Sequence, residues 1–345
     1  MTLTPTIAAD TLCLNKNEGP PLRPELRQRL LRLDGECLRR YPSRTALQSA
    51  LARRFCVDAG RVLVTAGGDD AFARWSRAAL TPGQSVLLHE PTFGLIRTTA
   101  EAAGARVEGL TWLEGPFPKD AFAERMVPTN GAIAPFALLV RPNNPTGRCV
   151  ENDTLRELLD RAGRQLVGVD LAYGEYAEPD ARELALELAA RENTLLFGTF
   201  SKAYGLAGLR VGYVLGPPEV VAAMDAAAGP YPVAGVALEL AEAALALGPD
   251  RAHIERVAVE RDQLAALLAG VGAICLPSSA NFVLTRPPVD ALALACALRT
   301  QGVVVRSFAG DGVLAPWLRI TCPGNPEQLE RLARALDAAL AEVTR

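Results

Sequence analysis

The sequence predicts an α/β protein with a large, mostly parallel sheet flanked by helices and a smaller C-terminal α/β domain. Short apolar runs alternate with helical segments between residues 62 and 199, which is typical of parallel strands joined by helices. The pattern changes after Gly229-Pro-Tyr-Pro232, where a long helical stretch begins. A chain of 345 residues with 49% hydrophobic residues can build two domains with substantial cores.

We therefore divide the chain into three parts. Residues 1–30 form a proline-rich arm that we expect to pack with the small domain or a partner subunit. Residues 31–232 form the large domain. Residues 233–345 form an interdomain helix and the small C-terminal domain.

The elements of the large domain follow from apolar periodicity. Helices are expected over 24–33 and 46–55. Between residues 62 and 198 the expected strands are 62–65, 85–89, 106–112, 136–140, 166–170 and 194–198. The helices between them are expected over 71–80, 91–103, 152–162 and 182–191. Residues 67–70 are expected to form a turn, with Asp69 or Asp70 capping the helix that follows.

The C-terminal part has a different order of elements. A helical region is expected over 233–269, followed by a strand over 280–284 and a helix over 289–300. Two strands over 303–306 and 318–321 and a helix over 326–343 complete it. We expect these helices to cover one side of a small sheet.

Composition excludes several classes of protein. A net charge of −3 provides no basic excess for nucleic acid, and no apolar run reaches the ~18 residues of a membrane span. The N-terminal residues lack the basic and apolar regions of a signal peptide. Seven scattered cysteines without a C-x-x-C pair indicate reduced thiols in the cytoplasm. With only two histidines, we expect no metal site.

Lys202 is the first residue that indicates chemistry. It follows an apolar strand and lies among glycines, in Gly198-Thr-Phe-Ser-Lys-Ala-Tyr-Gly205, and partial desolvation makes such an amine a nucleophile toward a carbonyl. Arg210 is the nearest strong anion binder and suits a phosphate. Pyridoxal phosphate needs both groups, because it binds lysine as a Schiff base. The alternative is an ordinary glycine-rich loop.

Other candidate residues also follow predicted strands, and the carboxyl ends of parallel strands meet at one edge of a sheet. Gly68 and Asp69 open a helix, so their backbone N–H groups form an anion site, unless this is an ordinary capped turn. Phe93 is a candidate for stacking on a flat ring, although core packing is the alternative.

Asp170 ends an apolar strand, where a carboxylate is costly to desolvate without a partner. A protonated pyridine nitrogen is such a partner; a helix cap or a surface ion pair is the alternative. Tyr173 and Asn144 follow neighbouring strands and are candidates to hydrogen-bond the phenolic oxygen of the same ring.

From Leu14 to about Leu336 the sequence resembles the fold type I pyridoxal-phosphate aminotransferases, most closely their histidinol-phosphate branch. The motifs that carry the resemblance are Asn15-Lys-Asn-Glu18, Arg40-Tyr-Pro42, Gly67-Gly-Asp-Asp70, Pro91-Thr-Phe93, Pro142-Asn-Asn-Pro-Thr-Gly147, Val169-Asp-Leu-Ala-Tyr173, Ser201-Lys-Ala-Tyr-Gly-Leu-Ala-Gly-Leu-Arg210, Pro230-Tyr-Pro232, Ser279-Ala-Asn-Phe282, Val305-Arg306 and Leu318-Arg-Ile-Thr321.

The resemblance implies a role for each matching residue. Lys202 would carry pyridoxal phosphate and later move a proton, and Asp170 would pair with the ring nitrogen. The remaining cofactor contacts would come from Tyr173 and Asn144 at the phenolic oxygen, Phe93 against the ring, and Ser201, Arg210, Gly68 and Asp69 at the phosphate. Tyr41 would reach the phosphate of a neighbouring subunit, which implies a homodimer.

The resemblance also implies the substrates, an amino donor and a 2-oxo acid such as 2-oxoglutarate. Arg319 would bind their acidic groups, with Arg306 and Asn17 nearby. Arg306 could instead be a solvated charge at a strand end. The sequence departs from the family at three of these motifs: Gly19 follows Asn17-Glu18 where asparagine is frequent, Phe93 stands where tyrosine is common, and Asp70 replaces a frequent glutamate.

Two other readings remain open at this point. The same scaffold serves aromatic amino-acid aminotransferases, threonine-phosphate-type decarboxylases, and biosynthetic lyases or oxidases. A cofactor-sensing regulatory domain would need a DNA-binding module, and the short stretch before Leu14 leaves no room for one.

Overall fold

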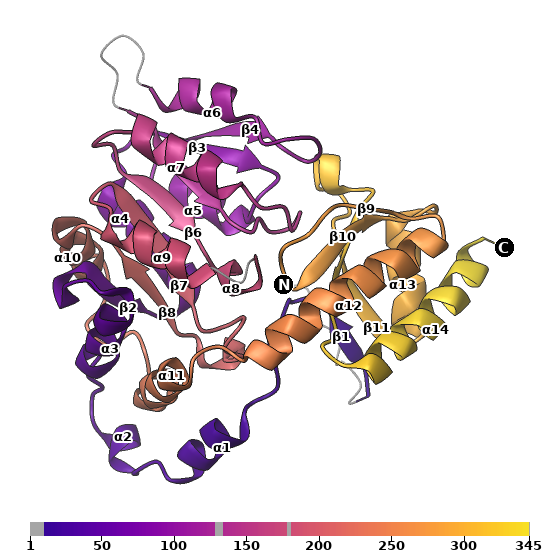
Figure 1. Ribbon diagram of the computed structural model, residues 1–345, viewed down its shortest axis with the longest axis horizontal. Helices are drawn as coiled ribbons and strands as arrows, with labels where there is room; N and C mark the ends of the chain where they lie inside the picture. The colour runs from indigo at the N-terminus through magenta and orange to yellow at the C-terminus, as the bar shows by residue number, and fades with distance from the viewer. Residues whose placement is uncertain (1–9, 128–133, 178–180, 345) are drawn as a thin grey trace. The chain divides into compact units, whose positions relative to one another are not determined.

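A computed structural model describes residues 10–127, 134–177 and 181–344. The chain forms two compact units (Figure 1). The terminal unit, which holds both chain ends, comprises Met1–Glu18, Pro145–Gly147 and Ala252–Arg345, and the central unit comprises Gly19–Asn144 and Arg148–Arg251. These units divide the chain differently from the domain ranges 1–30, 31–232 and 233–345, which stay a prediction.

The central unit is built on a seven-stranded sheet with the order β2-β8-β7-β6-β5-β3-β4. Its strands are β2 (Val62–Thr65), β3 (Ser85–Glu90), β4 (Arg106–Thr111), β5 (Phe136–Val140), β6 (Val167–Asp170), β7 (Thr194–Thr199) and β8 (Gly212–Leu215). Only β8 is antiparallel to its neighbours β2 and β7, and the remaining pairs are parallel. The predicted fold class is therefore confirmed.

Helices cover both faces of this sheet because its strands are apolar on both sides. In β7, Leu195 and Phe197 pack on one core and Leu196 on the other. The first core includes α4 (Gly67–Ala79), α5 (Gly94–Ala102) and α10 (Pro218–Ala226). The second includes α3 (Thr45–Phe55), α6 (Lys119–Met126), α7 (Asn152–Arg161), α9 (Ala181–Ala190) and α11 (Gly235–Leu247). The short helices are α1 (Pro24–Leu31), α2 (Glu36–Arg39) and α8 (Gly174–Ala177).

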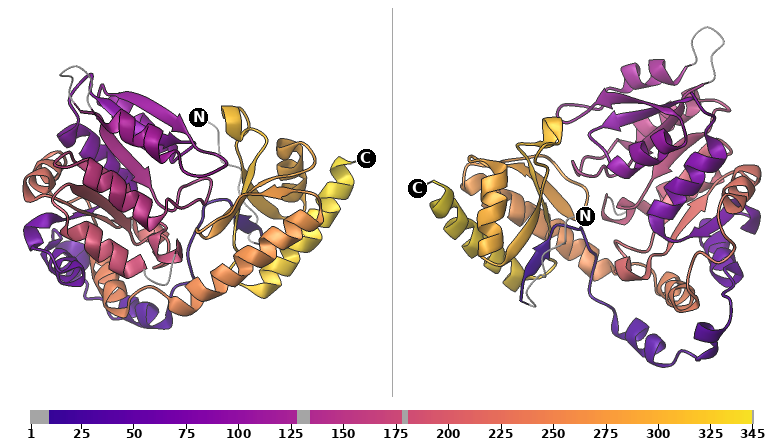
Figure 2. Two further views of the ribbon diagram at one scale, coloured as in Figure 1. Left: turned by 45° about the horizontal axis from the view of Figure 1, so that its top comes forward. Right: turned by 180° about the vertical axis from the view of Figure 1, so that it is seen from behind.

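In the part of the chain that the structure describes, the terminal unit contains a five-stranded sheet. Helices cover one face of this sheet (Figure 2). The strand order is β1 (Leu12–Leu14), β11 (Val303–Ser307), β12 (Leu318–Thr321), β10 (Phe282–Arg286) and β9 (Ile274–Cys275). The helices are α12 (Arg251–Gly270), α13 (Ala291–Thr300) and α14 (Pro326–Val343). Leu318 and Ile320 of β12 face these helices across a small apolar cavity, so Arg319 between them faces the other side.

Two sequence predictions are wrong. Residues 67–70 are the first turn of α4 rather than a separate turn, and neither Asp69 nor Asp70 is its N-cap. Ala66 takes the N-cap position, and the Asp70 carboxylate accepts the Ala66 N–H from within the helix at 2.9 Å. The helical region 233–269 is two helices, because Gly248 has a left-handed φ of 74° and Pro249 follows it.

Seven α-helices and strands of the described residues were not predicted: β1, α2, α6, α8, β8, α10 and β9. Strand β1 pairs in parallel with β11, so that Leu12 lies opposite Val303. Strand β8 is only four residues long and follows the glycine-rich loop directly. Such short elements are fixed by partners distant in sequence, and local periodicity carries little trace of them.

Candidate active site

Five of the six described parallel strands of the central unit have candidate residues at their carboxyl ends, which share one edge of the sheet. Strands β3, β5, β6 and β7 are mutually parallel, and β2 shares their direction because β8 runs antiparallel to both β2 and β7. Ligands bind at this edge in open α/β sheets. The predicted cofactor residues other than Tyr41 and Arg210 follow these five strand ends: Gly68, Asp69, Phe93, Asn144, Asp170, Tyr173, Ser201 and Lys202.

Asp170 is the last residue of β6 and is 5% exposed. Burial raises the pKa of its carboxyl group to about 6, while a hydrogen bond from the Ala172 N–H at 2.8 Å and the charge of Lys202 act in the opposite direction. The ionised form therefore gains from any further positive partner. A positively charged group that can donate a hydrogen bond would therefore be a suitable partner for the Asp170 carboxylate.

Lys202 and Tyr173 come together from the turns that follow β7 and β6. The Lys202 Nζ lies 5.4 Å from the centre of the Tyr173 ring, which is buried. Asp170, Tyr173 and Lys202 thus form one group, in which an amine lies over an aromatic face near a carboxylate.

Gly19 fits closely against the turn that carries Lys202. A Cβ atom at this position would lie 1.7 Å from the Lys202 carbonyl oxygen, which no side chain tolerates. Gly205, with φ of 68°, is similarly close to the Pro20 carbonyl oxygen. The family's frequent asparagine cannot replace Gly19 on this backbone, so this departure from the motif has a structural reason.

The start of α4 and the loop after β7 approach each other closely. A Cβ atom on Gly212 would lie 2.7 Å from the Gly67 carbonyl carbon, and one on Gly67 would lie 2.7 Å from Arg210 Nη2. Arg210 has a left-handed φ of 52°. Its guanidinium donates to Ser201 Oγ at 3.4 Å and to Asp69 Oδ2 at 3.2 Å.

These contacts place a guanidinium and a hydroxyl beside the N-terminal end of α4. Thr199 supports the hydroxyl, because its Oγ1 lies 3.0 Å from Ser201 Oγ and accepts the Ser201 N–H at 3.1 Å. A helix N-terminus together with an arginine is a typical anion site. Thr199 was not predicted as a site residue, although its place at a strand end two residues before Ser201 is a signal for it.

Asn143 supports the segment that carries Phe93. Its side chain donates to the Pro91 carbonyl oxygen at 2.8 Å and accepts the Thr92 hydroxyl at 2.7 Å. Phe93 is half-buried, with its ring centre 6.2 Å from that of Phe72. Asn144, the next residue after Asn143, is also half-buried.

A second group of polar residues, which the sequence did not predict, links the turns of Tyr173 and Lys202 through Arg54. Glu175 lies two residues after Tyr173, and burial raises its pKa to about 7 against the opposing charges of Arg54 and Arg251. Tyr204 lies two residues after Lys202 and hydrogen-bonds Arg54. The sequence signal for this group is a polar residue two positions after Tyr173 and another two positions after Lys202.

The predicted substrate residues lie in the terminal unit. Arg319 on β12 and Arg306 on β11 are direct partners across an antiparallel pair, so their side chains share one face of the sheet. Arg319 is 8% exposed, donates to the Asn15 carbonyl oxygen at 2.8 Å and lies 5.3 Å from the Phe282 ring centre. Two arginines side by side repel each other unless an anion lies between them.

Asn17 is 1% exposed, and its Oδ1 accepts the Thr321 hydroxyl at 3.0 Å. The backbone near Asn17 is held by the Asn281 side chain, which donates to the carbonyl oxygens of Asn17 and Glu18. These contacts attach the N-terminal arm to β12 and β10.

Tyr41 lies on the surface of the chain, next to Tyr231. Its side chain is 82% exposed and stacks on Tyr231, with ring centres 4.5 Å apart.

Among the residues that the structure describes, no helix is both long enough and apolar enough to cross a membrane.

The fold and the strand-end site define the class of protein, a fold type I pyridoxal-phosphate enzyme. Residues 11–336 match the family model described as aminotransferase class I and II. The chain belongs to the aminotransferase class I and II family and is a transaminase that uses pyridoxal phosphate.

Individual relatives support this assignment. The chain is 37% identical to a histidinol-phosphate aminotransferase of Symbiobacterium thermophilum, over 96% of this chain and 91% of the relative. It is 35% identical to an aromatic amino acid aminotransferase of Corynebacterium jeikeium, over 89% and 82%. Its fold matches the crystal structure of Sinorhizobium meliloti histidinol-phosphate aminotransferase in complex with pyridoxal-5'-phosphate, with a TM-score of 0.85, 24% identity and coverage of 96% and 91%. The resemblance noted in the sequence is confirmed.

Proposed function

We propose that this transaminase moves an amino group from histidinol phosphate to 2-oxoglutarate, as part of histidine biosynthesis. The observation that carries the proposal is the group formed by Asp170, Tyr173 and Lys202 at the ends of adjacent strands. The names of several relatives support the choice of donor.

The residues fit the parts of pyridoxal phosphate. The buried Asp170 carboxyl, with its pKa raised to about 6, is stabilised as an anion by a protonated ring nitrogen. The N-terminal end of α4, with Ser201 and Arg210, suits a phosphate, and the glycines there leave no side chain in the way. Lys202 supplies the amine.

Pyridoxal phosphate, when bound, supplies an aldehyde and an electron-withdrawing ring. Lys202 would hold this aldehyde through its Nζ, and the same amine would move a proton at the substrate Cα. The Asp170 carboxylate keeps the ring nitrogen protonated. The Tyr173 hydroxyl and the Asn144 amide hold the phenolic oxygen, and Phe93 limits movement of the ring.

The phosphate end is proposed to be bound by four groups of this chain. The backbone N–H groups of Gly68 and Asp69, the Ser201 hydroxyl and the Arg210 guanidinium all donate to anions. The Tyr41 hydroxyl is proposed to reach the phosphate in a second copy of the chain.

The acidic groups of both substrates are assigned to the terminal unit. Arg319 binds a carboxylate or phosphate with its planar fork, and Arg306, its cross-strand neighbour, adds a second positive charge. Asn17 is assigned a supporting contact with the substrate.

The alternative is another reaction on the same cofactor. The relative from Corynebacterium jeikeium favours an aromatic amino acid as donor. A panel of amino donors with 2-oxoglutarate decides between them: glutamate should form fastest with histidinol phosphate. Faster turnover of phenylalanine or tyrosine would assign the chain to the aromatic reaction. Release of carbon dioxide, an eliminated product or hydrogen peroxide without glutamate would assign it to a decarboxylase, a lyase or an oxidase.

We also propose that the chain works as a cytoplasmic homodimer with shared active sites. Leu31, Leu38 and Tyr41 are 78%, 77% and 82% exposed and lie close together in sequence, on or after α1 and α2, which is typical of an interface. All seven cysteines are free thiols, which suits a reducing compartment. Light scattering should give a dimer at micromolar concentration, and a fully active monomer would remove Tyr41 from the site.

A further inference from the structure

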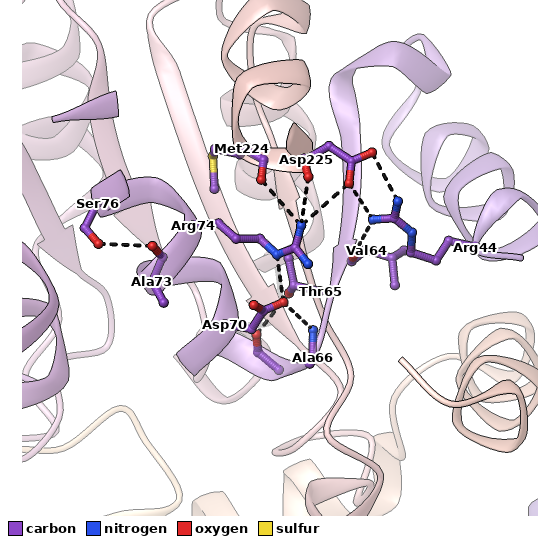
Figure 3. Close-up of polar contacts among 11 residues, drawn as sticks. Arg44, Val64, Thr65, Ala66, Asp70, Ala73, Arg74, Ser76, Met224 and Asp225 are labelled. Atoms are coloured by element: carbon purple, nitrogen blue, oxygen red, sulfur yellow. Dashed lines mark hydrogen bonds and ion pairs between the residues drawn. The ribbon is translucent and has the colours of Figure 1, made fainter. Parts of the chain in front are cut away.

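A network of alternating charges connects the N-terminal part of α4 with α10 and the start of α3 (Figure 3). It consists of Asp70 and Arg74 on α4, Asp225 on α10, and Arg44 at the start of α3; we call these four residues the Arg74 network. The Arg74 side chain at its centre is 0% exposed. An arginine cannot lose its proton, so burying it requires anions and carbonyl oxygens around it.

Arg74 and Asp70 join the helix to the end of strand β2. The Arg74 Nε donates to Asp70 Oδ2 at 2.8 Å, and the same oxygen accepts the Ala66 N–H at 2.9 Å. Ala66 is the residue after Thr65, the last of β2. The Asp70 Oδ2 atom therefore connects the two ends of the segment 66–70, because it belongs to residue 70 and accepts the N–H of residue 66.

The other side of Arg74 is attached to α10 and α3. Its Nη1 lies 3.4 Å from the carbonyl oxygens of Met224 and Asp225 and 3.6 Å from Asp225 Oδ1. The Asp225 carboxylate accepts two hydrogen bonds from Arg44, at 2.9 and 3.1 Å. Arg44 also donates to the Val64 carbonyl oxygen in β2 at 3.3 Å. The network thus fixes β2, α4, α10 and α3 relative to one another.

Between its fixed ends, the segment 66–70 has little of its own to hold its shape. Gly67 has φ of 83°, and a Cβ on Gly68 would meet no atom within 4 Å. Glycine backbones have many conformations available, so they need outside contacts to keep one of them. The contacts include a hydrogen bond from Thr65 Oγ1 to the Gly67 carbonyl oxygen at 2.9 Å and the one that Asp70 accepts from Ala66. Arg210 also donates to Asp69 Oδ2 at 3.2 Å.

Charge gives a second argument. An unpaired carboxylate in the first turn of α4 would repel an anion bound at that helix end. Arg74 neutralises Asp70, while Arg44 balances Asp225, so the four residues sum to zero charge. The segment is therefore fixed without adding a negative charge beside the anion site.

We propose that Asp70 and Arg74 are positioning residues for the phosphate end of the cofactor. They hold the backbone N–H groups of Gly68 and Asp69 in the conformation that binds phosphate, and neither touches the cofactor. This inference rests on the proposed function of Gly68 and Asp69. Asp70 would thus act from within the helix, rather than as its N-cap.

The test compares two ligands that differ only in the phosphate. Equilibrium dissociation constants for pyridoxal phosphate and for pyridoxal are measured on the apo chain for wild type, Asp70→Asn, Arg74→Met and Asp70→Glu. The Asn and Met variants should bind pyridoxal phosphate about 10- to 100-fold more weakly, by analogy with the loss that follows when residues supporting a metal ligand are removed. Their affinity for pyridoxal should stay within about twofold of wild type. Asp70→Glu, which keeps the charge opposite Arg74, should recover most of the affinity.

Ser76→Ala is the matched control. Ser76 is also buried on α4, and its hydroxyl donates to the Ala73 carbonyl oxygen, away from the network (Figure 3). It should change neither constant. If Arg74→Met does not fold, Asp225→Asn removes an anion from the far side of Arg74 and should give the same phosphate-specific loss.

Equal weakening of both ligands, or no weakening of either, overturns the proposal, because the network would then support only the stability of the fold. A wild-type chain that binds neither ligand overturns the proposed function, and this inference with it. The two failures are therefore distinguishable.

Discussion

The two sheets of this transaminase carry their candidate side chains in different ways. In the central unit, the residues follow parallel strand ends, so each comes from a short stretch directly after a buried strand. In the terminal unit, Arg306 and Arg319 lie within antiparallel strands and meet only through their register. The first arrangement collects many different groups at one edge, whereas the second places two like groups side by side.

This difference suggests a division of labour. A strand-end site can combine an amine, a carboxylate and a helix N-terminus, which are the groups that reaction chemistry needs. A cross-strand arginine pair offers positive charge and planar guanidinium groups, which are suited to binding a carboxylate or phosphate through two hydrogen bonds. Substitutions at the strand ends should therefore lower turnover, while those in the arginine pair should raise KM.

The largest effect is expected for Lys202→Ala. Without the amine, turnover should fall at least ~1,000-fold, because the nucleophile and the proton carrier are lost together. The chain has only three lysines, Lys16, Lys119 and Lys202. Borohydride reduction of the yellow protein followed by peptide mapping should place the cofactor on Lys202 alone. Lys119→Ala is the control, since that amine is paired with Glu157 at 2.7 Å on the surface.

A protein that stays colourless with added pyridoxal phosphate, or a label on Lys16 or Lys119, would contradict the strand-end site.

The second effect concerns Asp170. Asp170→Asn keeps the shape and can still accept the Ala172 N–H, but it removes the negative charge. Turnover should drop at least ~100-fold, which is the scale of losing a strong electrostatic contact in a site, while pyridoxal phosphate remains bound. Rates and cofactor absorbance measured on the same sample check both parts. Near-normal turnover would mean that the carboxylate is structural.

The third prediction tests the arginine pair. Arg319→Lys keeps the charge but loses the fork, so KM should rise about 10-fold for both the amino donor and 2-oxoglutarate, with cofactor affinity unchanged. Arg306→Lys should have a smaller effect, because Arg306 is exposed. Steady-state kinetics with each substrate varied in turn give the four KM values.

Arg286→Lys serves as the control for the pair, since Arg286 lies on the neighbouring β10 with its guanidinium 5.6 Å from the centre of the Trp317 ring. Unchanged KM values in Arg319→Lys would transfer the acid-binding role to another residue.

The smallest expected effect is on the stability of the fold and concerns His89. This residue lies on β3 of the central sheet, and its side chain is buried in the core. Its Nε2 accepts the Val140 N–H at 3.0 Å, and burial lowers its pKa from 6.5 to about 4. The folded chain holds His89 neutral while the unfolded chain protonates it below pH 6.5. The stability that comes from keeping His89 neutral in the folded chain is therefore complete above pH 6.5. As the pH falls toward 4, the unfolding free energy decreases by roughly 3 kcal/mol at most.

His89→Gln cannot titrate but can still accept a hydrogen bond. Urea unfolding at several pH values should show a steeper loss of unfolding free energy between pH 6.5 and 4 in wild type than in this variant. Parallel pH profiles would mean that His89 does not stay neutral in the folded chain.

The positions of the candidate residues at the strand ends could be predicted from sequence because their signals are local. A lysine among glycines after an apolar run, or an aspartate that ends one, identifies a strand end within ten residues. The alternation of strands and helices then makes the sheet parallel and brings those ends together. Family motifs assigned the roles, and the pattern alone left alternatives open for Phe93, Asp170 and Arg306.

The tertiary structure alone decided the contacts between residues distant in sequence. Nothing local shows that Leu12 pairs with Val303, that Arg306 lies opposite Arg319, or that Gly19 touches the Lys202 carbonyl. Arg74 looks like a surface charge in a helix of ordinary composition, yet it is fully buried. Whether a charge is buried depends on which elements pack over it, and here an anion from α10, about 150 residues later, makes that burial possible.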